Sequence, residues 1–385
     1  MKNFWQKLKK PIFVLAPMAD VTDIAFREII TKYSKFGGDY DLWQEEGKFT
    51  RPLAEPVGGP DVFWTEFVSA DGLVSEKGRE HLMIDLAYTK AERPIVAQLF
   101  TSKPDNMRKA AELVRKLGFD GLDINMGCPD RTIEKQGAGA ALMKTPKLAQ
   151  EIIYAAMDGA GDMPVSVKTR LGYNKDVLEE WLPIILETKP AAITVHARTR
   201  KDMSKVPARW ERVADAVKIR DQYQGSTSIN LGRTLIIGNG DVVDTNDARR
   251  KSEESGADGA MFGRAIFGNP FLFKNKNVLS GSEWQNILSA KERLNVLVEH
   301  TKLFEEYFIT QTRPITFGAS THHVKGRPRE ASANGTLGLK SFNVMKKHYK
   351  AYCNGFDGAK ELRMKLMEAE NSMGVENIVK EFLKE

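Results

Sequence analysis

Residues 120–129 read DGLDINMGCP, a short apolar run that ends in a polar loop. The run Gly121–Asn125 is too short for a helix and is typical of a buried parallel strand. Cys128 therefore lies on the loop at the C-terminal end of a strand, where parallel α/β proteins place their active sites. The chain has one other cysteine, Cys353, so neither a disulfide framework nor a cysteine metal cluster accounts for Cys128. A single thiol in this position is either a reactive group or a packing residue.

Similar runs, rich in β-branched and aromatic residues, alternate with helical patterns along the chain. The runs that we expect to form strands are Ile12–Ala16, Phe63–Ser69, Pro94–Leu99, Gly121–Asn125, Pro164–Thr169, Ala192–His196, Thr234–Gly238 and Gly259–Phe262. The segments that we expect to form helices are Asp23–Thr31, Glu80–Tyr88, Pro104–Leu117, Lys147–Met157, Asp176–Glu187, Trp210–Tyr223 and Thr245–Ser255. This alternation predicts the α/β class and a (β/α)8 TIM barrel. A doubly wound open sheet is the alternative, but residues 16–20, APMAD, lack the glycine-rich fingerprint it needs.

The alternation stops near residue 285, and only helical patterns follow. These helices are expected at Ala290–Tyr307, Phe342–Tyr352, Ala359–Glu370 and Val375–Leu383. We therefore expect a barrel domain over residues 1–285 and an all-α helical domain over residues 286–385. Segments rich in Gly, Pro and polar residues indicate long loops at residues 35–61, 225–232 and 318–338.

Composition indicates an ordinary globular protein. The 385 residues are 42% hydrophobic and 28% charged, and no apolar stretch approaches the roughly 20 residues that a membrane helix needs. Residues 1–10 are basic and precede IFVLA, but that run is shorter than the apolar region of a secretory signal and fits a first buried strand better. Two cysteines also suit a reducing compartment. We expect a cytoplasmic monomer with no membrane attachment.

The positive charge is concentrated near the C-terminus. The whole chain carries a net charge of +6, whereas residues 322–365 hold ten Lys and Arg against three Asp and Glu. A basic stretch of this kind is either a nucleic-acid-binding surface or a solvated basic face.

Candidate site residues occur at or just beyond the C-terminal end of almost every expected strand, and within the second. In chain order they are Pro17 and Met18 after the first strand, Glu66 within the second, Gln98, Asn125 with Cys128, Lys168, His196 with Arg198, Asn239 with Gly240, and Gly263 with Arg264. A barrel does not need a lysine or a histidine at these tips, where removing their charge from water is costly. Because the strand ends of a barrel meet on one face, the pattern predicts a single site there.

The turns after the seventh and eighth expected strands resemble a phosphate site. They read Gly238-Asn239-Gly240 and Gly263-Arg264-Ala265. Glycines let the backbone N–H groups approach an anion, Arg264 adds a charge, and barrels place phosphates at these two loops. The alternative is two ordinary tight turns.

Several other residues suit an aromatic cofactor. A cation such as Lys168 can stabilise the anion formed when a flavin is reduced, although it can equally pair with a carboxylate. His196, with Arg198 two residues on, suits a phosphate or flavin contact. Gln98 and Asn125 can each donate and accept hydrogen bonds at the edge of a flavin or pyrimidine ring. The pair His322-His323 has no further ligand at metal-binding spacing, so we expect no metal.

Taken together, these motifs resemble the flavin-dependent tRNA dihydrouridine synthases. The matching motifs in the barrel are Ala16-Pro17-Met18, Gln98-Leu99-Phe100, Asn125-Met126-Gly127-Cys128-Pro129, Gly137-Ala138-Gly139-Ala140, Val167-Lys168-Thr169-Arg170-Leu171-Gly172, His196-Ala197-Arg198-Thr199-Arg200, Ile237-Gly238-Asn239-Gly240-Asp241 and Gly263-Arg264-Ala265. In the C-terminal region, Lys347-His348 and residues 355–363, GFDGAKELR, resemble the tRNA-binding domain of that family. Thr101 departs from the family pattern, which often has Gly there.

The resemblance implies an FMN enzyme that uses NADPH to reduce a uridine of the tRNA D-arm to 5,6-dihydrouridine. Cys128 would be the catalytic proton donor, since a thiol is mostly protonated at neutral pH. Cofactor binding would fall to Pro17, Met18, Gln98, Lys168, His196, Asn239, Gly240, Gly263 and Arg264. Substrate binding would fall to Asn125, Arg198, Arg200, Lys346 and Lys347. The glycine-rich stretch after Cys128 would form a mobile lid.

The loop after the sixth expected strand adds a second basic region. Arg198, Arg200, Lys201, Lys205, Arg209 and Arg212 surround Trp210 there. Such a group can contact phosphates and stack one base, or it can be a solvated basic face around a packed tryptophan.

Two rival functions stay open at this point. One is a small-molecule FMN oxidoreductase of barrel fold, similar to dihydroorotate dehydrogenase, which would have no use for a basic helical domain. The other is a non-catalytic RNA-binding protein with an inactive barrel, which would not take up FMN.

Overall fold

The computed structural model describes residues 3–38, 56–225, 232–274, 289–318, 320–321 and 339–384. These residues belong to two compact units. The first consists of Met1–Met18, Asp61–Leu86 and Arg93–Arg264, and the second of Ala19–Pro60, Ala87–Glu92 and Ala265–Glu385. The second unit thus includes two segments from the first hundred residues. The boundary at residue 285 stays a prediction.

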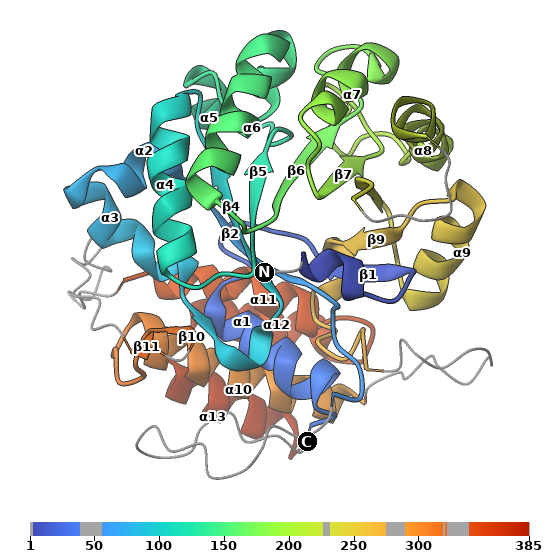
Figure 1. Cartoon of the computed structure of the whole chain (residues 1–385). Helices are drawn as coiled ribbons and strands as arrows, with labels where there is room; N and C mark the ends of the chain where they lie inside the picture. The colour runs from blue at the N-terminus through green and yellow to red at the C-terminus, as the bar shows by residue number, and fades with distance from the viewer. Residues whose placement is uncertain are drawn as a thin grey trace. The chain divides into compact units, whose positions relative to one another are not determined.

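The first unit is a barrel of eight parallel strands (Figure 1). In spatial order the strands are β1 (Ile12–Leu15), β9 (Gly259–Phe262), β8 (Leu235–Asn239), β7 (Ala192–His196), β6 (Val165–Arg170), β5 (Gly121–Asn125), β4 (Ile95–Phe100) and β2 (Phe63–Ser69). A parallel bridge between Val14 and Val62 joins β1 to the residues before β2, and the N–H of Leu15 donates to the carbonyl of Val62 over 3.2 Å. The predicted TIM barrel is confirmed, with every strand within one residue of its expected bounds.

Helices follow the strands on the outside of this barrel. They are α2 (Ala70–Val74), α3 (Glu76–Leu82), α4 (Pro104–Lys116), α5 (Arg131–Lys135), α6 (Pro146–Ala160), α7 (Leu178–Glu187), α8 (Trp210–Gln224) and α9 (Thr245–Ser255). In α4, for example, Pro104 starts the helix and Met107, Ala110, Ala111 and Val114 are buried at the 3–4 spacing of one face. The short α2 and α5 were not expected from the sequence.

One end of the barrel is sealed by the N-terminal residues. A 3-10 helix, Phe4–Lys7, places Trp5 against a buried cluster that includes Ile12, Leu235 and Ala192, which begin their strands. Trp5 is 2% exposed, and its ring centroid lies 5.8 Å from that of Trp64. Because apolar side chains fill the N-terminal end of the strands, the C-terminal ends are left for a site.

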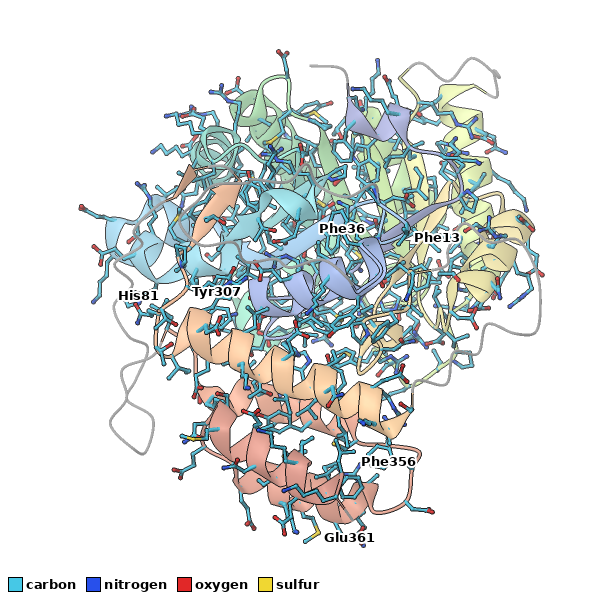
Figure 2. The ribbon with its side chains drawn as sticks, turned by 90° about the horizontal axis from the view of Figure 1, so that it is seen from below. Phe13, Phe36, His81, Tyr307, Phe356 and Glu361 are labelled. Atoms are coloured by element: carbon cyan, nitrogen blue, oxygen red, sulfur yellow. The ribbon has the colours of Figure 1, made fainter. Side chains whose placement is uncertain are left out.

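The second unit is mainly helical. It holds α1 (Ile24–Ile30), α10 (Ala290–Phe308), α11 (Met345–Tyr352), α12 (Ala359–Glu368), α13 (Ser372–Phe382) and the short strands β3 (Tyr88–Thr89), β10 (Thr316–Gly318) and β11 (Ser320–Thr321). The long helix α10 packs against α1, α11 and α13, as the lower part of Figure 2 shows for the C-terminal helices. The four helices expected after residue 285 are therefore present.

A buried arginine joins the segments at the start of this unit. The guanidinium of Arg27 and the carboxylate of Glu92, both fully buried, form an ion pair of 2.5 Å. The same guanidinium donates to the carbonyl oxygens of Thr22 and Ala87. Since a buried charge needs such partners, α1 and the segment 87–92 are held together.

The helix expected at Glu80–Tyr88 ends earlier than predicted. Helix α3 stops at Leu82 and is followed by a 3-10 turn, Met83–Leu86. Tyr88 belongs instead to β3, which pairs with β10.

Most of the expected loops at 35–61, 225–232 and 318–338 lie outside the described residues. Among the helices that are described, none is both long and apolar enough to cross a membrane.

We predict that Gly259→Ala lowers the free energy of unfolding by about 2 kcal/mol, because strain of this kind costs on the order of 1–3 kcal/mol. A Cβ on Gly259 would lie 2.0 Å from the carbonyl oxygen of Ile12, in the pairing that joins the first strand to the last. Urea unfolding measures the difference. Gly263→Ala is the matched control, since its Cβ would meet nothing within 4 Å. Equal stability of the Gly259 variant and the wild type would contradict the prediction.

Candidate active site

The loop that carries Cys128 is shaped by the side chain of Asn125. Its carboxamide oxygen Oδ1 accepts hydrogen bonds from the N–H groups of Gly127 at 3.1 Å and Cys128 at 2.9 Å. Asn125 is the last residue of β5 and is 5% exposed, so the turn begins where the strand ends. The thiol is thus placed at the strand tip by a local hydrogen-bonded turn.

A buried chain of polar groups holds Asn125 in turn. Asn125 Nδ2 donates to Gln98 Oε1 at 2.9 Å, and Gln98 Nε2 donates to Asp123 Oδ2 at 2.6 Å. The other oxygen of Asp123 accepts from the Ser166 hydroxyl at 2.5 Å. Burial raises the pKa of Asp123 to about 6, against the opposing effect of these hydrogen bonds. This row of hydrogen-bonded side chains crosses β4, β5 and β6. Gln98 is fully buried and supports Asn125, while its expected cofactor contact stays a prediction.

Cys128 is partly buried, and its surroundings keep it as a thiol. Burial raises the pKa of Cys128 above its ordinary value, while the nearby cations Arg170 and Lys168 oppose that shift. Because the pKa is raised, the sulfur carries its proton at neutral pH. Arg170 also fixes the loop, since its Nε donates to the carbonyl of Gly127 at 2.7 Å.

Lys168 and His196 lie on the neighbouring strands β6 and β7. Lys168 Nζ donates to Asn239 Oδ1 at 3.2 Å, and Asn239 Nδ2 donates to the carbonyl of Met261 at 2.9 Å. Burial lowers the pKa of Lys168 to about 8, helped by repulsion from Arg170. Burial and the surrounding cations hold the pKa of His196 well below its ordinary range, so its imidazole is neutral at pH 7. A bound anion would offset the electrostatic repulsion between these closely spaced cations.

The two glycine turns offer backbone donors beside open space. Gly240 has φ +122°, and a Cβ there would lie 2.7 Å from Ala208 Cβ, so only glycine fits. A Cβ on Gly263 would meet nothing within 4 Å. Within the described part of the chain, the N–H groups of Gly240 and Gly263 donate to no other residue. Arg264 is mostly exposed and bonds Asp241 at 2.8 Å. This cradle of free donors and space fits a phosphate group.

The remaining cofactor residues expected from the sequence follow β1. Pro17 is buried, and Met18 packs partly against the barrel cluster. They lie at the C-terminal end of β1, which pairs with β9 immediately before Gly263. The strand ends therefore bring Met18, Asn239 and Gly263 to the same face of the barrel. Glu66 lies within β2 and is 4% exposed.

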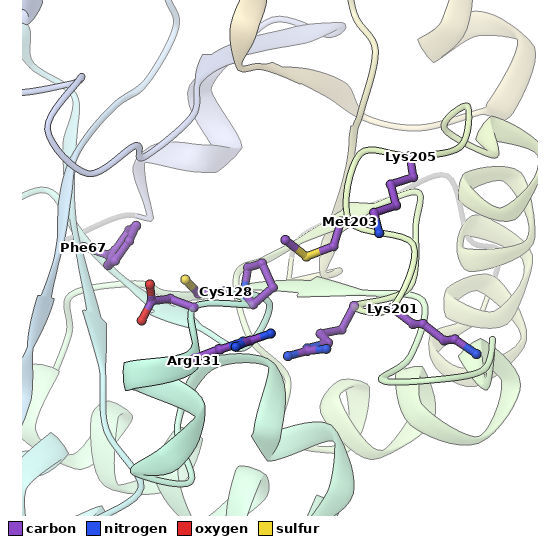
Figure 3. A pocket seen from close by; sticks show the side chains of 9 residues that line it. Phe67, Cys128, Arg131, Lys201, Met203 and Lys205 are labelled. Atoms are coloured by element: carbon purple, nitrogen blue, oxygen red, sulfur yellow. The ribbon is translucent and has the colours of Figure 1, made fainter. Parts of the chain in front are cut away.

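A cavity of about 660 Å³ opens beside Cys128 (Figure 3). The residues that line it are Phe67, Cys128, Pro129, Asp130, Arg131, Arg200, Lys201, Met203 and Lys205. In Figure 3, Phe67 and Met203 lie on opposite sides of Cys128. Four cations and one carboxylate line the cavity, so it suits an anionic ligand of nucleotide size.

Arg198 and Trp210, in and after the loop that follows β7, are bonded to other groups of the protein. Arg198 is 3% exposed, and its guanidinium bonds Asp241 and the carbonyl of Val206. Trp210 donates from its indole nitrogen to the carbonyl of Gly240 at 2.8 Å, and a Cβ on Gly238 would lie 2.3 Å from its ring. This packing favours a structural role for Trp210 over base stacking.

Lys346 and Lys347 lie on α11 in the second unit. Lys347 is half exposed, and its Nζ lies 3.2 Å from Asp20 Oδ2. The neighbouring cations Lys325, Arg327 and Arg329, and the pair His322-His323, fall outside the described residues. Among the residues that are described, no group of three or more His, Cys, Asp or Glu side chains could hold a metal ion.

Comparison with known proteins places the chain in a family. The family model described as dihydrouridine synthase matches residues 14–385. The chain belongs to the dihydrouridine synthase family. It is therefore an oxidoreductase, and the resemblance read from its motifs is confirmed.

Relatives match this dihydrouridine synthase family member over almost its whole length. A Bacillus subtilis (strain 168) protein named probable tRNA-dihydrouridine synthase 2 is 35% identical over 382 residues, covering 99% of this chain and 97% of that protein. A Staphylococcus aureus (strain COL) protein named probable tRNA-dihydrouridine synthase is 32% identical over 382 residues, covering 99% and 96%. Among solved structures, morphinone reductase has a TM-score of 0.43 at 13% identity, covering 68% of this chain and 84% of that one. A similarity at that level supports no argument on function.

Sequence reasoning missed several residues that build the site of this family member. Asp123, Ser166 and Asp241 hold the functional side chains but were not singled out. Asp123 had one signal, a carboxylate within the apolar run Gly121–Asn125, where an acidic side chain needs a buried partner.

We predict that alkylation of Cys128 by iodoacetamide reaches half its maximal rate at a higher pH than that of free cysteine. The thiolate is the reactive form, and burial raises the pKa of Cys128, so less thiolate is present at any given pH. Mass spectrometry over a pH series measures the rate. Cys128→Ala gives the background from Cys353, which is fully buried. A midpoint at or below that of free cysteine would mean that the nearby cations outweigh burial.

Proposed function

We propose that this protein is a tRNA dihydrouridine synthase that reduces the C5–C6 double bond of a D-arm uridine, with FMN as cofactor and NADPH as reductant. The observation that carries the proposal is the thiol of Cys128 lining a basic cavity, in a chain of the dihydrouridine synthase family. The relatives' names point to tRNA as the substrate.

The proposed cofactor site is the face formed by the ends of β1, β4, β6, β7, β8 and β9. The N–H groups of Gly240 and Gly263, with Arg264, would bind the phosphate of FMN. Lys168, His196 and Asn239 would lie along the ring, with Pro17, Met18 and Gln98 on the side of the first strands. Lys168 is charged below pH 8 and becomes more so beside an anion, since an opposite charge raises the pKa of an amine.

The proposed reaction adds a hydride to C6 of the uracil and a proton to C5. FMN, when bound, would carry the two electrons from NADPH and deliver the hydride. Cys128 Sγ would donate the proton to C5 and regain one from solvent, which restores the thiol. The raised pKa of Cys128 keeps the proton in place until that step. The second amide hydrogen of Asn125 would be available to the uracil edge.

The uridine must leave the tRNA stack to reach Cys128. Extrusion of a base costs a few kcal/mol, which contacts between cations and phosphates can offset. Arg131, Lys201 and Lys205 line the cavity beside Cys128 and would meet the flanking phosphates. We further propose that residues 286–385, with Lys346 and Lys347, form the tRNA-binding domain of a cytoplasmic monomer. A small-molecule oxidoreductase would have no use for these cations.

We predict that Cys128→Ala slows dihydrouridine formation by about 10²–10⁴-fold, the usual contribution of a general acid. FMN binding and oxidation of NADPH should stay near wild-type values, because the thiol acts only on C5. Dihydrouridine in unmodified tRNA transcripts is measured by mass spectrometry, and cofactor reduction by absorbance. An equal loss of cofactor reduction by NADPH would contradict the proton-donor role. A wild-type protein that binds FMN but modifies no tRNA would contradict the proposed function.

We predict that Lys346→Ala combined with Lys347→Ala weakens tRNA binding and lowers the slope of log affinity against log salt by about 1–2, since each phosphate contact contributes about 0.9. Filter binding over a series of salt concentrations measures this slope. Lys109→Ala with Lys116→Ala removes the same charge from α4 on the barrel and should leave the slope unchanged. An unchanged slope in the α11 variant would exclude these two lysines as phosphate contacts.

A further inference from the structure

Arg200, which lines the same cavity as Cys128, forms a two-point ion pair with Glu134. Arg200 Nε lies 2.6 Å from Glu134 Oε1, and Nη2 contacts Oε2 as a second bond. The Glu134 side chain is 9% exposed and that of Arg200 is 25% exposed. A guanidinium bound by both oxygens of a carboxylate in a poorly solvated place has a defined geometry.

The position of Arg200 is fixed from its own side as well. Its N–H donates to the carbonyl of Gly172 at 2.8 Å, and its guanidinium lies 5.1 Å from the ring centre of Tyr173. Lys144 Nζ lies 4.4 Å from the same ring centre. The loops after β6 and β7 therefore meet at Arg200, which makes it a rigid anchor for its partner.

Glu134 belongs to α5, which follows Cys128 by three residues. This helix has only five residues, too few to be stable without tertiary contacts. Its described apolar contact is Ile133, which packs with Phe100, Ala138 and Cys128. The carbonyl of Cys128 accepts from the N–H of Ala140, so the segment after α5 returns to the thiol. The ion pair is thus a main connection between the segment that carries Cys128 and the loop after β7.

We propose that the Glu134–Arg200 ion pair is a latch that positions the Cys128 segment over the uridine cavity, so that Arg200 is a positioning residue and not a phosphate contact. The catalytic consequence rests on the proposed function. Arg170 also connects the Cys128 segment to the loop after β7, because it donates to the carbonyl of Gly127 and to that of Thr199. Loss of the latch lets the thiol sample positions from which transfer of its proton to C5 is slow.

The test compares Glu134→Gln, Arg200→Gln and the exchanged pair Glu134→Arg with Arg200→Glu in the full-length protein. The first readout is alkylation of Cys128 by iodoacetamide at fixed pH without tRNA. We expect each single variant to be alkylated about tenfold faster, corresponding to about 1.4 kcal/mol, and the exchanged pair to return most of the way to the wild-type rate. Arg250→Gln removes an ion pair with Glu254 on α9 and should change nothing.

The second readout is turnover on tRNA. We expect each single variant to lower kcat about tenfold, with KM and the salt dependence of tRNA binding unchanged. Alkylation rates equal to wild type in both single variants would overturn the latch. Weaker tRNA binding with a smaller salt slope in Arg200→Gln alone would overturn it in favour of a phosphate contact. Since alkylation needs neither FMN nor tRNA, it tests the latch even if the wild-type protein reduces no uridine.

Discussion

The hydrogen bonds accepted by the Asn125 carboxamide are the constraint on which the candidate site depends. They turn the chain at the end of β5. As a result the thiol of Cys128, three residues after Asn125, faces the cavity instead of the barrel interior. An amide can do this reliably only if its own rotation is blocked. Gln98, Asp123 and Ser166 block it from three adjacent strands, at the cost of burying a carboxyl group. The barrel therefore provides a fixed frame for the loop that carries Cys128.

The barrel could be predicted from the sequence because each strand is a short apolar run bounded by turn residues. The same regularity predicts the site, since parallel strands of a closed barrel end on one face. Lys168 and Asn239 illustrate this, because they are 71 residues apart and bonded to each other. The fold was thus predicted closely. The prediction of which residues belong to the site depended on that geometry together with the family motifs.

Side-chain partners could not be predicted in the same way. Arg200 reads as a phosphate contact in a basic loop, yet Glu134, 66 residues earlier, occupies its guanidinium. The sequence left Trp210 open as either a stacking ring or a packed side chain, because it does not show that the absence of a side chain on Gly238 leaves the space that Trp210 fills. β3 and β10 have two and three residues, too few for a periodic pattern, and they pair across more than 200 residues of chain. Long-range pairing of this kind leaves no local signal.

The pairing of β1 with β9 has a consequence for synthesis of the protein. Ile12 finds its partner Gly259 only after about 250 further residues have left the ribosome, which at about 5–20 residues per second takes on the order of tens of seconds. Until then the apolar edge of β1 and the indole of Trp5 have no completed interior to enter. Newly made chains should accordingly be substrates for chaperones that shield exposed strand edges, and translation pauses before residue 259 should lower the yield of native protein.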